Sequence, residues 1–177
     1  DQAAAWLDGK IYAVGGASTA TMANVFVYDP EEGAWAELPD LPTAREKPQA
    51  AAVDGKLYVF GGWSDDGDPV ASVDVFDPAA NTWSTASAQN PSPVAAGGAA
   101  VIDGKVLLVG GCTTGDCDTT AGSVLFDPAS GFSEVAAYPH PVSWISCGGV
   151  SGKGYCAGGL NGEVTFTDGF AYDASAD

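Results

Sequence analysis

The sequence is poor in positive charge. Lys and Arg together number 6 against 23 Asp and Glu, which gives a formal net charge of −17. Proteins bind phosphate backbones largely through Lys and Arg side chains that displace counterions. We therefore discount DNA, RNA and anionic membrane surfaces as partners. The acidity indicates a means of staying soluble or a salty environment.

Long apolar runs and catalytic signatures are also missing. No stretch of 18 apolar residues exists, so we expect no transmembrane helix. No Gly-x-Ser-x-Gly elbow, P-loop or His-Glu-x-x-His motif is present. The only histidine, His140, lies between two prolines, and we expect it to be a solvent-exposed loop residue. The sequence thus predicts no catalytic residue and no cofactor.

The sequence does contain a recurring motif. Residues 54–62 predict a turn, an apolar strand and a glycine pair, and the same motif occurs at 8–16 and 103–111, with a degenerate copy at 151–159. The glycine pairs lie 46, 49 and 48 residues apart and start at Gly15, Gly61, Gly110 and Gly158. A fixed period of this length is typical of repeat architectures.

Each of the first three repeats predicts four short antiparallel strands, and the degenerate fourth predicts three. A small apolar segment leads into Asp-Gly, a strong hairpin signal, and the strand that follows is apolar on both faces. A third strand ends in an Asp-Pro turn, and an aromatic residue then opens a fourth. Trp35 and Trp83 occupy this aromatic position in the first two repeats, and we expect both to lie in the core. Proline-rich links join the repeats.

Four antiparallel strands per repeat form one propeller blade. The order Asp-Gly-Lys, apolar strand, Gly-Gly, Tyr/Phe-Asp-Pro and Trp resembles the kelch repeat over essentially the whole chain. The expected fold class is therefore all-β, a kelch-type β-propeller segment of about 3.75 blades in a single domain, residues 1–177. The expected blades are 1–47, 48–95, 96–142 and a partial fourth at 143–177.

The blade count predicts an incomplete propeller. The kelch resemblance implies six or seven blades, so we expect the remaining blades to come from a parent chain, from another chain or from a symmetry mate. A four-bladed ring closed by this chain is the alternative. The chain opens inside an expected strand, and we expect further segments around it.

The four cysteines fall into two local pairs. Cys147 and Cys156 are placed symmetrically about the turn at Ser151-Gly152, a register that brings them opposite each other on adjacent strands. We predict the disulfide Cys147–Cys156; two buried thiols are the alternative. Cys112 and Cys117 enclose a small loop and predict a second disulfide, with a metal pair as the rival. Two disulfides favour a secreted or cell-surface location.

Residues 63–69 form an acidic loop beside a tryptophan. Asp65, Asp66 and Asp68 provide oxygen ligands of the kind that calcium prefers, and Gly67 permits a sharp turn. The spacing does not match an EF-hand. These residues are weak candidates for a calcium site, and a solvated turn is the simpler interpretation.

The loops after the second strands and the links between blades are expected at one end of the propeller, where recognition usually occurs. Trp63, Trp144 and Tyr138 lie in these segments and are the predicted ligand-binding anchors, because aromatic side chains dominate contact energetics and stack on sugars. Packing beneath their own loops is the alternative for each. Arg45, in a link, is expected to pair with a carboxylate or to orient a ligand.

These features predict a non-catalytic module that binds a protein or a carbohydrate. The first alternative is part of a propeller enzyme, such as an epimerase, a glycan-acting hydrolase or an oxidase, whose catalytic residues lie largely outside this segment. The copper site implied by a resemblance to galactose oxidase-like propellers needs two histidines, and this chain has one. The second alternative is a structural subunit that completes a propeller with another chain.

Overall fold

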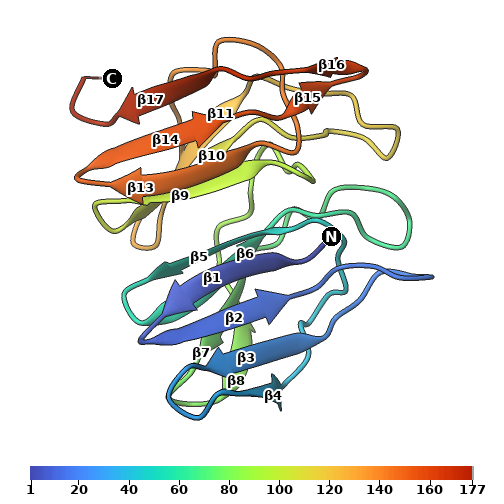
Figure 1. Cartoon of the computed structure of the whole chain (residues 1–177), viewed down its shortest axis with the longest axis vertical. Coiled ribbons are helices and arrows are strands. Elements are labelled where there is room, and N and C mark those ends of the chain that lie inside the picture. The colour runs from blue at the N-terminus through green and yellow to red at the C-terminus, as the bar shows by residue number, and fades with distance from the viewer. Residues whose placement is uncertain (177) are drawn as a thin grey trace.

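The computed structural model describes residues 1–176, and all regular structure in this range is β-strand (Figure 1). No helix in the described range is long and apolar enough to cross a membrane. Three sheets have four antiparallel strands each, in the order in which the strands occur along the chain. Blade 1 contains β1 (Ala3–Leu7), β2 (Lys10–Val14), β3 (Val25–Asp29) and β4 (Ala34–Leu38). Blade 2 contains β5 (Gln49–Val53), β6 (Lys56–Phe60), β7 (Asp74–Asp77) and β8 (Thr82–Thr85). Blade 3 contains β9 (Gly98–Ile102), β10 (Lys105–Val109), β11 (Ser123–Asp127) and β12 (Gly131–Glu134).

The fourth blade has three strands, as the degenerate repeat predicts. They are β13 (Ser146–Val150), β14 (Lys153–Ala157) and β17 (Gly169–Asp173). The segment between the last two, expected to be a plain loop, contains a small hairpin of β15 (Leu160–Asn161) and β16 (Val164–Thr165). The sequence gives little warning of it, because two residues per strand are too few to show a pattern.

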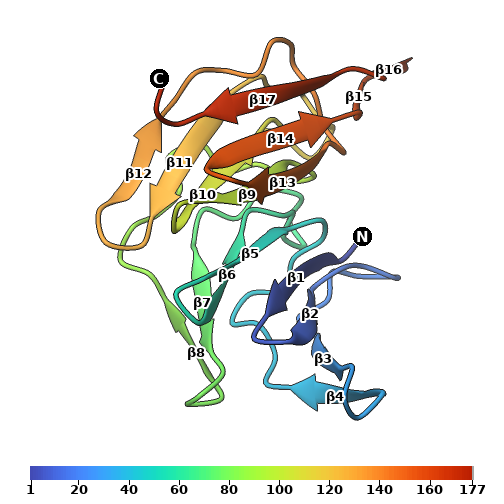
Figure 2. The same cartoon turned by 60° about the vertical axis from the view of Figure 1, so that its left-hand side comes forward.

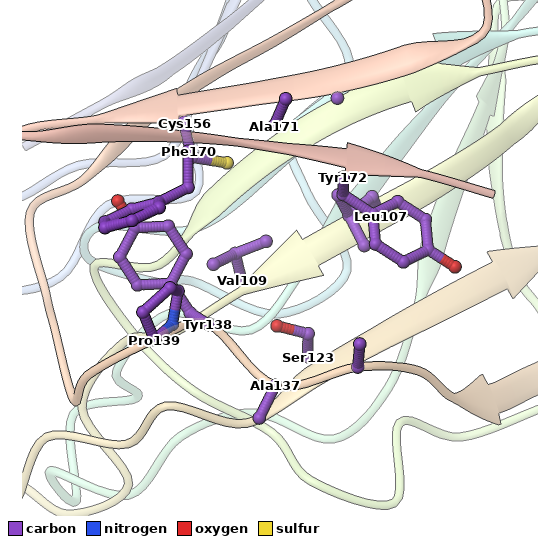
Figure 3. Close-up of a pocket in the computed structure, with 12 residues that line it drawn as sticks. Leu107, Val109, Ser123, Ala137, Tyr138, Pro139, Cys156, Phe170, Ala171 and Tyr172 are labelled. Carbon is purple, nitrogen blue, oxygen red and sulfur yellow. The ribbon is translucent and has the colours of Figure 1, made fainter. Parts of the chain in front are cut away.

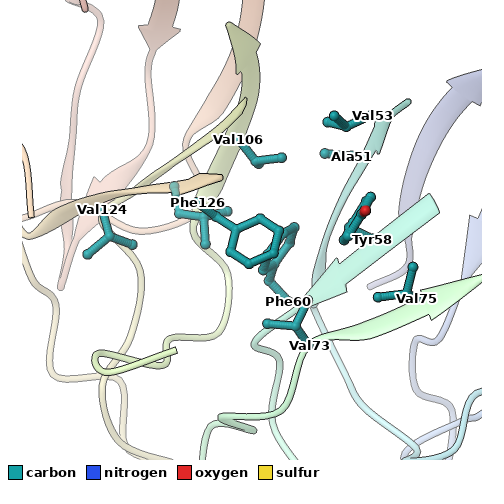
Figure 4. Packing of buried hydrophobic residues seen from close by; sticks show 10 residues of the cluster. Ala51, Val53, Tyr58, Phe60, Val73, Val75, Val106, Val124 and Phe126 are labelled. Atoms are coloured by element: carbon teal, nitrogen blue, oxygen red, sulfur yellow. The ribbon is translucent and has the colours of Figure 1, made fainter. Parts of the chain in front are cut away.

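The hydrophobic cores lie between blades. On the second strand of each blade, neighbouring side chains point to opposite faces, so one set packs on the preceding blade and the other on the following blade. Figure 4 shows the core between blades 2 and 3, where Tyr58 and Phe60 meet Phe126 with ring centroids 5.6 and 5.2 Å apart. Equivalent clusters join blade 1 to blade 2 and blade 3 to blade 4.

The two outer flanks of the array are open. The innermost strands contact one another in the order β1, β5, β9 and β13, and the blades follow each other from blue to red in Figures 1 and 2. Trp6 on blade 1 is 60% exposed, and Val150 and Tyr155 on blade 4 are 60% and 46% exposed. The alternative of a closed four-bladed ring is therefore wrong for this structure.

Trp35 does not lie in the core, although its position in the repeat predicts that it should. Trp83 packs on Phe76, with ring centroids 5.1 Å apart, and joins the core between blades 1 and 2. Trp35 makes the same contact with Tyr28 at 5.2 Å, yet it is 56% exposed rather than buried. The aromatic on the fourth strand faces the preceding blade, and for Trp35 the described residues contain no such blade.

A lysine–aspartate ion pair recurs in every blade. It joins the Lys of Asp-Gly-Lys, or of Ser-Gly-Lys in blade 4, to the Asp that ends the third strand. The Nζ–Oδ2 distances are 2.8, 3.6, 3.3 and 2.9 Å for Lys10–Asp29, Lys56–Asp77, Lys105–Asp127 and Lys153–Asp173. The same aspartate accepts a hydrogen bond from the backbone N–H two residues later. The lysine after the first hairpin turn and the aspartate that ends the third strand thus act together to fix the turn after that strand.

The lysine–aspartate ion pair predicts that the protein loses stability in acid. Hydrogen bonds from Ser175 and the neighbouring Lys153 lower the pKa of Asp173 to about 2, whereas an unfolded Asp has a pKa of about 3.9. A lowered folded pKa contributes stability above the unfolded pKa, and that contribution is lost as pH falls through the folded pKa. We expect the difference in urea midpoint between the wild type and Asp173→Asn to shrink between about pH 5 and about pH 2. A constant difference across this range would contradict the assignment.

Candidate functional site

The links between blades and the loops after the second strands lie together at one end of the array, on the right of Figure 1. Backbone bridges join each link to the loop of its own blade: Glu46 to Trp63, Ala95 to Cys112 and Ser143 to Leu160. We call this end the loop face.

A chain of backbone hydrogen bonds runs from blade to blade along the inner rim of the loop face. The N–H of Lys47 donates to the carbonyl of Asp1 at 2.9 Å, that of Ala96 to Lys47 at 3.0 Å, and that of Trp144 to Ala96 at 2.7 Å. Lys47, Ala96 and Trp144 have positive φ angles of 49°, 53° and 50°. Such backbone conformations are costly for non-glycine residues and persist where the surrounding structure enforces them.

Two tryptophans from different blades meet above this rim. Trp63 of blade 2 and Trp144 of blade 4 have ring centroids 6.3 Å apart. The Lys47 ammonium lies over both, 5.3 Å from the Trp63 centroid and 5.1 Å from that of Trp144, which is within the range of a cation–π interaction. Glu46 Oε1 is 3.1 Å from the same Nζ. We call Trp63, Trp144 and Glu46, which surround the Lys47 ammonium, the tryptophan cage.

Neighbouring loops hold the cage in place. The indole Nε1–H of Trp63 donates to the carbonyl of Thr114 at 3.0 Å. Thr114 lies within the small loop that the Cys112–Cys117 disulfide closes. Thr119 of that same segment is hydrogen-bonded to Asn161 of blade 4 at 2.7 Å. The loop of blade 3, itself tied to blade 4, therefore holds the Trp63 indole in one orientation.

The second disulfide lies inside the array. The structure contains Cys147–Cys156 across the β13–β14 hairpin, where the two residues are directly opposite. Cys156 is buried in the core between blades 3 and 4. A Cβ atom on Gly98 would lie 2.3 Å from Cys147 Sγ, so the disulfide occupies space that a missing side chain in blade 3 provides.

Arg45 lies below the loop face and is fully buried. Its guanidinium donates to the carboxylate of Asp74 and to the carbonyl of Gly61. Burial lowers the pKa of Arg45, and the Asp74 carboxylate opposes that shift. The structure thus shows carboxylate pairing, the first of the two roles expected for this residue, and leaves its guanidinium out of reach of a surface ligand.

Tyr138 lies in the core between blades 3 and 4 and is 8% exposed, so it packs beneath its link rather than standing on the surface. It lines a mostly apolar cavity of about 170 Å³ with Phe170, Val109 and Ser123 (Figure 3). Burial raises the pKa of its phenol.

His140 is not the solvated loop residue that its position between prolines indicates. Its ring stacks on Phe166 at 3.9 Å, and Nε2 is 3.3 Å from Asp168. Phe166 and Asp168 follow the unexpected hairpin, which explains why sequence spacing alone did not reveal these contacts.

The three aspartates of the acidic loop do not converge on one site. Asp65 accepts hydrogen bonds from the backbone N–H and the hydroxyl of Thr21, which lower the pKa of its carboxyl and tie the loops of blades 1 and 2 together. Asp66 and Asp68 are exposed. Among residues 1–176, no group of three or more His, Cys, Asp or Glu side chains is placed to hold a metal ion.

Lys47 is the site residue that the sequence reasoning missed. The signal was available, because Lys47, Ala96 and Trp144 are spaced 49 and 48 residues apart and so occupy equivalent positions. Blade 3 has the small residue Ala96 at this position.

Comparison with protein families agrees with the repeat. The model described as KLHDC2/KLHL20/DRC7 Kelch-repeats domain matches residues 1–176. The chain belongs to the kelch-repeat family. The solved structure of YjhT has the same fold, with a TM-score of 0.78 and 18% identity over 89% of this chain and 58% of that one.

Curated relatives of this kelch chain are diverse. Kelch repeat and BTB domain-containing protein 13 of Homo sapiens is 34% identical over 146 residues, which cover 81% of this chain and 31% of the relative. N-acetylneuraminate epimerase of Pasteurella multocida is 37% identical over 106 residues, 55% of this chain and 27% of the relative. Kelch-like protein 35 of Mus musculus is 30% identical, covering 75% of this chain and 30% of the relative. The chain spans about a third or less of the length of these proteins.

Proposed function

We propose that this chain is a non-catalytic binding module that recognises a protein or a carbohydrate through its loop face. The observation that supports the proposal is the tryptophan cage. Trp144 is 42% exposed, and it lies against Trp63, which loops of neighbouring blades hold in one orientation. A rigid aromatic surface binds with a small loss of conformational entropy, and aromatic residues are the commonest anchors of binding interfaces.

The surroundings of the module are part of the proposal. The open flanks of blades 1 and 4 expose Trp6, Trp35, Val150 and Tyr155, which suit packing against further blades from the parent chain or from another chain. The two disulfides favour a secreted or cell-surface protein, because such bonds persist in oxidising compartments. Neither a metal ion nor an organic cofactor is part of the proposed binding function.

The proposal predicts that ligand affinity depends on Trp144. A glycan array and a displayed peptide library would first supply a ligand, and calorimetry would then measure its affinity. We expect Trp144→Ala to weaken binding by about tenfold or more, since truncating an aromatic anchor costs about 2 kcal/mol or more. Trp6→Ala is the matched control, because Trp6 is also exposed but lies on the flank of blade 1. Equal losses in the two variants, or no loss in Trp144→Ala, would contradict the proposal.

A propeller enzyme is the second candidate. It is favoured by the 37% identity to N-acetylneuraminate epimerase over 106 residues. Its catalytic residues would lie largely outside this segment. Proton NMR of N-acetylneuraminate, followed during its epimerisation, tests this function on the full-length protein. A reaction rate equal to that in buffer alone would rule out the enzymatic function.

A further inference from the structure

The tryptophan cage already holds a cation. The Lys47 ammonium lies over two indole faces and within 3.1 Å of Glu46 Oε1, with Asp1 Oδ1 at 3.4 Å. Two aromatic faces and a carboxylate are the groups by which proteins recognise quaternary and alkylated ammonium ions. The geometry around Lys47 Nζ is therefore that of an ammonium site whose present occupant belongs to the protein itself.

The occupant sits near the surface rather than in a closed core. The Lys47 side chain is 21% exposed and Trp144 is 42% exposed, so both can be reached from solvent. The other wall is fixed, because Trp63 donates to Thr114 and pairs its backbone with Glu46 at 2.8 and 2.9 Å. If Lys47 swings away, the rigid wall and the carboxylate remain in place.

Charge favours a cation from outside as the replacement. The chain has a net charge of −17 with only 6 Lys and Arg, so its surface attracts cations and repels anions over the Debye length. Departure of the Lys47 ammonium would leave the Glu46 carboxylate beside two electron-rich ring faces. An anion cannot replace the lysine there, and a neutral group would leave the carboxylate without its partner.

We infer that the tryptophan cage is a binding site for an ammonium group, such as a lysine side chain or a quaternary ammonium on a partner, and that Lys47 occupies it until that group displaces it. The inference rests on the proposed function, since it assigns a ligand chemistry to the same loop face. A resident competitor lowers apparent affinity by the fraction of time that the cage is free. Removing Lys47 therefore strengthens binding instead of weakening it.

The test uses choline as the cation and 3,3-dimethylbutanol as its neutral isostere, with tryptophan fluorescence and calorimetry as readouts. We expect Lys47→Ala to bind choline at least about tenfold more tightly than the wild type, because the rings become free for the ligand. Lys47→Met is the matched control, since it loses the same charge but still fills the cage. The gain should be absent in Lys47→Met and in the double variant Lys47→Ala/Trp144→Ala.

Two outcomes of the titrations with choline and 3,3-dimethylbutanol would overturn the inference. One is equal choline affinity in Lys47→Ala and Lys47→Met, which would mean that the cage is not the site. The other is an equal gain for 3,3-dimethylbutanol, which would mean that the cage binds apolar groups and not cations. If Lys47→Ala does not fold, NMR of the wild type decides: the Lys47 Hε resonances, shifted upfield by the two rings, should move toward random-coil positions as choline is added, and unmoved resonances overturn the inference. A neutral glycan whose affinity depends on Trp144 would overturn the ammonium assignment and leave the proposed function standing.

Discussion

Replacing Arg45 with methionine is expected to destabilise the propeller by about 3–5 kcal/mol, the usual cost of breaking a buried ion pair from one side. The side chains of Arg45 and Asp74 are 0% and 1% exposed. Without the guanidinium, the Asp74 carboxylate keeps a hydrogen bond from Thr85 at 3.1 Å but has no charge partner in the interior. The carbonyls of Gly61 and Ser72 also lose their donor. Urea unfolding of Arg45→Met against the wild type measures the loss.

Blade 3 supplies the control for this experiment. The carbonyls of Arg45 and Val94 each accept a hydrogen bond from the second glycine of the preceding blade, so these residues are equivalent. Asp74 and Val124 are also equivalent, since each lies opposite the fourth residue of the second strand of its blade. The double variant Arg45→Val/Asp74→Val therefore copies an apolar arrangement that the fold already accommodates. We expect it to recover most of the lost stability, because replacing both members of a buried pair is often neutral. Additive losses would show that the pair is not the source of the effect.

The interior of each blade could be predicted from the sequence because its determinants are local. Asp-Gly turns, apolar second strands and Asp-Pro turns each depend on a few consecutive residues, and the observed strands follow them in the first three repeats. The fourth repeat keeps its strands although Ser151-Gly152 and Asp173-Ala174 replace the two turns. The pairing of Cys147 with Cys156 depends only on hairpin register, and the structure has that register. Trp35 was misjudged because its burial depends on a neighbouring blade and not on its own repeat.

The site was harder to predict because its members meet across blades. Trp63 and Trp144 are far apart in the sequence, and nothing local shows that their rings lie 6.3 Å apart. Arg45 and Tyr138 are residue types that often act as surface anchors. Each lies in a link between blades, yet its side chain is buried beneath the loop face. Only alignment of the repeats against one another, position by position, would have placed Lys47 on the same rim as Trp144.

Gly61→Ala is expected to be one of the most damaging glycine substitutions in the chain. Gly61 has a φ of 54°, and a Cβ atom there would lie 2.0 Å from the carbonyl oxygen of Val94 in the next link. That carbonyl cannot retreat, because it accepts the N–H of Gly62 at 3.0 Å. We expect a loss of more than about 4 kcal/mol, the range reserved for substitutions that force the backbone apart. Thermal and urea unfolding, followed by circular dichroism, measure it.

Alanine substitutions at two other glycines separate the cost of the steric clash from the cost of backbone strain. Gly55 has a φ of 73° with no atom within 4 Å of its missing Cβ, so Gly55→Ala should cost only about 1–2 kcal/mol. Gly158 is the first glycine of its pair, like Gly61, but its nearest neighbour is a carbonyl 3.9 Å away, because the described residues contain no following link. Gly158→Ala should therefore resemble Gly55→Ala in this chain. If it costs as much as Gly61→Ala, the glycine pair is needed for local conformation alone.

The pattern of contacts gives each glycine of the pair a separate task. The first glycine approaches the carbonyl of the next blade's link: Gly15 that of Arg45, Gly61 that of Val94 and Gly110 that of Val142. The second approaches its own link, as Gly62 does at Glu46, Gly111 at Ala95 and Gly159 at Ser143. The missing side chain of the first glycine thus makes room for the link of the next blade, and that of the second makes room for the link of its own blade. In a longer chain with a fifth blade, Gly158→Ala should become as costly as Gly61→Ala, and the difference between the two lengths measures the contact that a following blade adds.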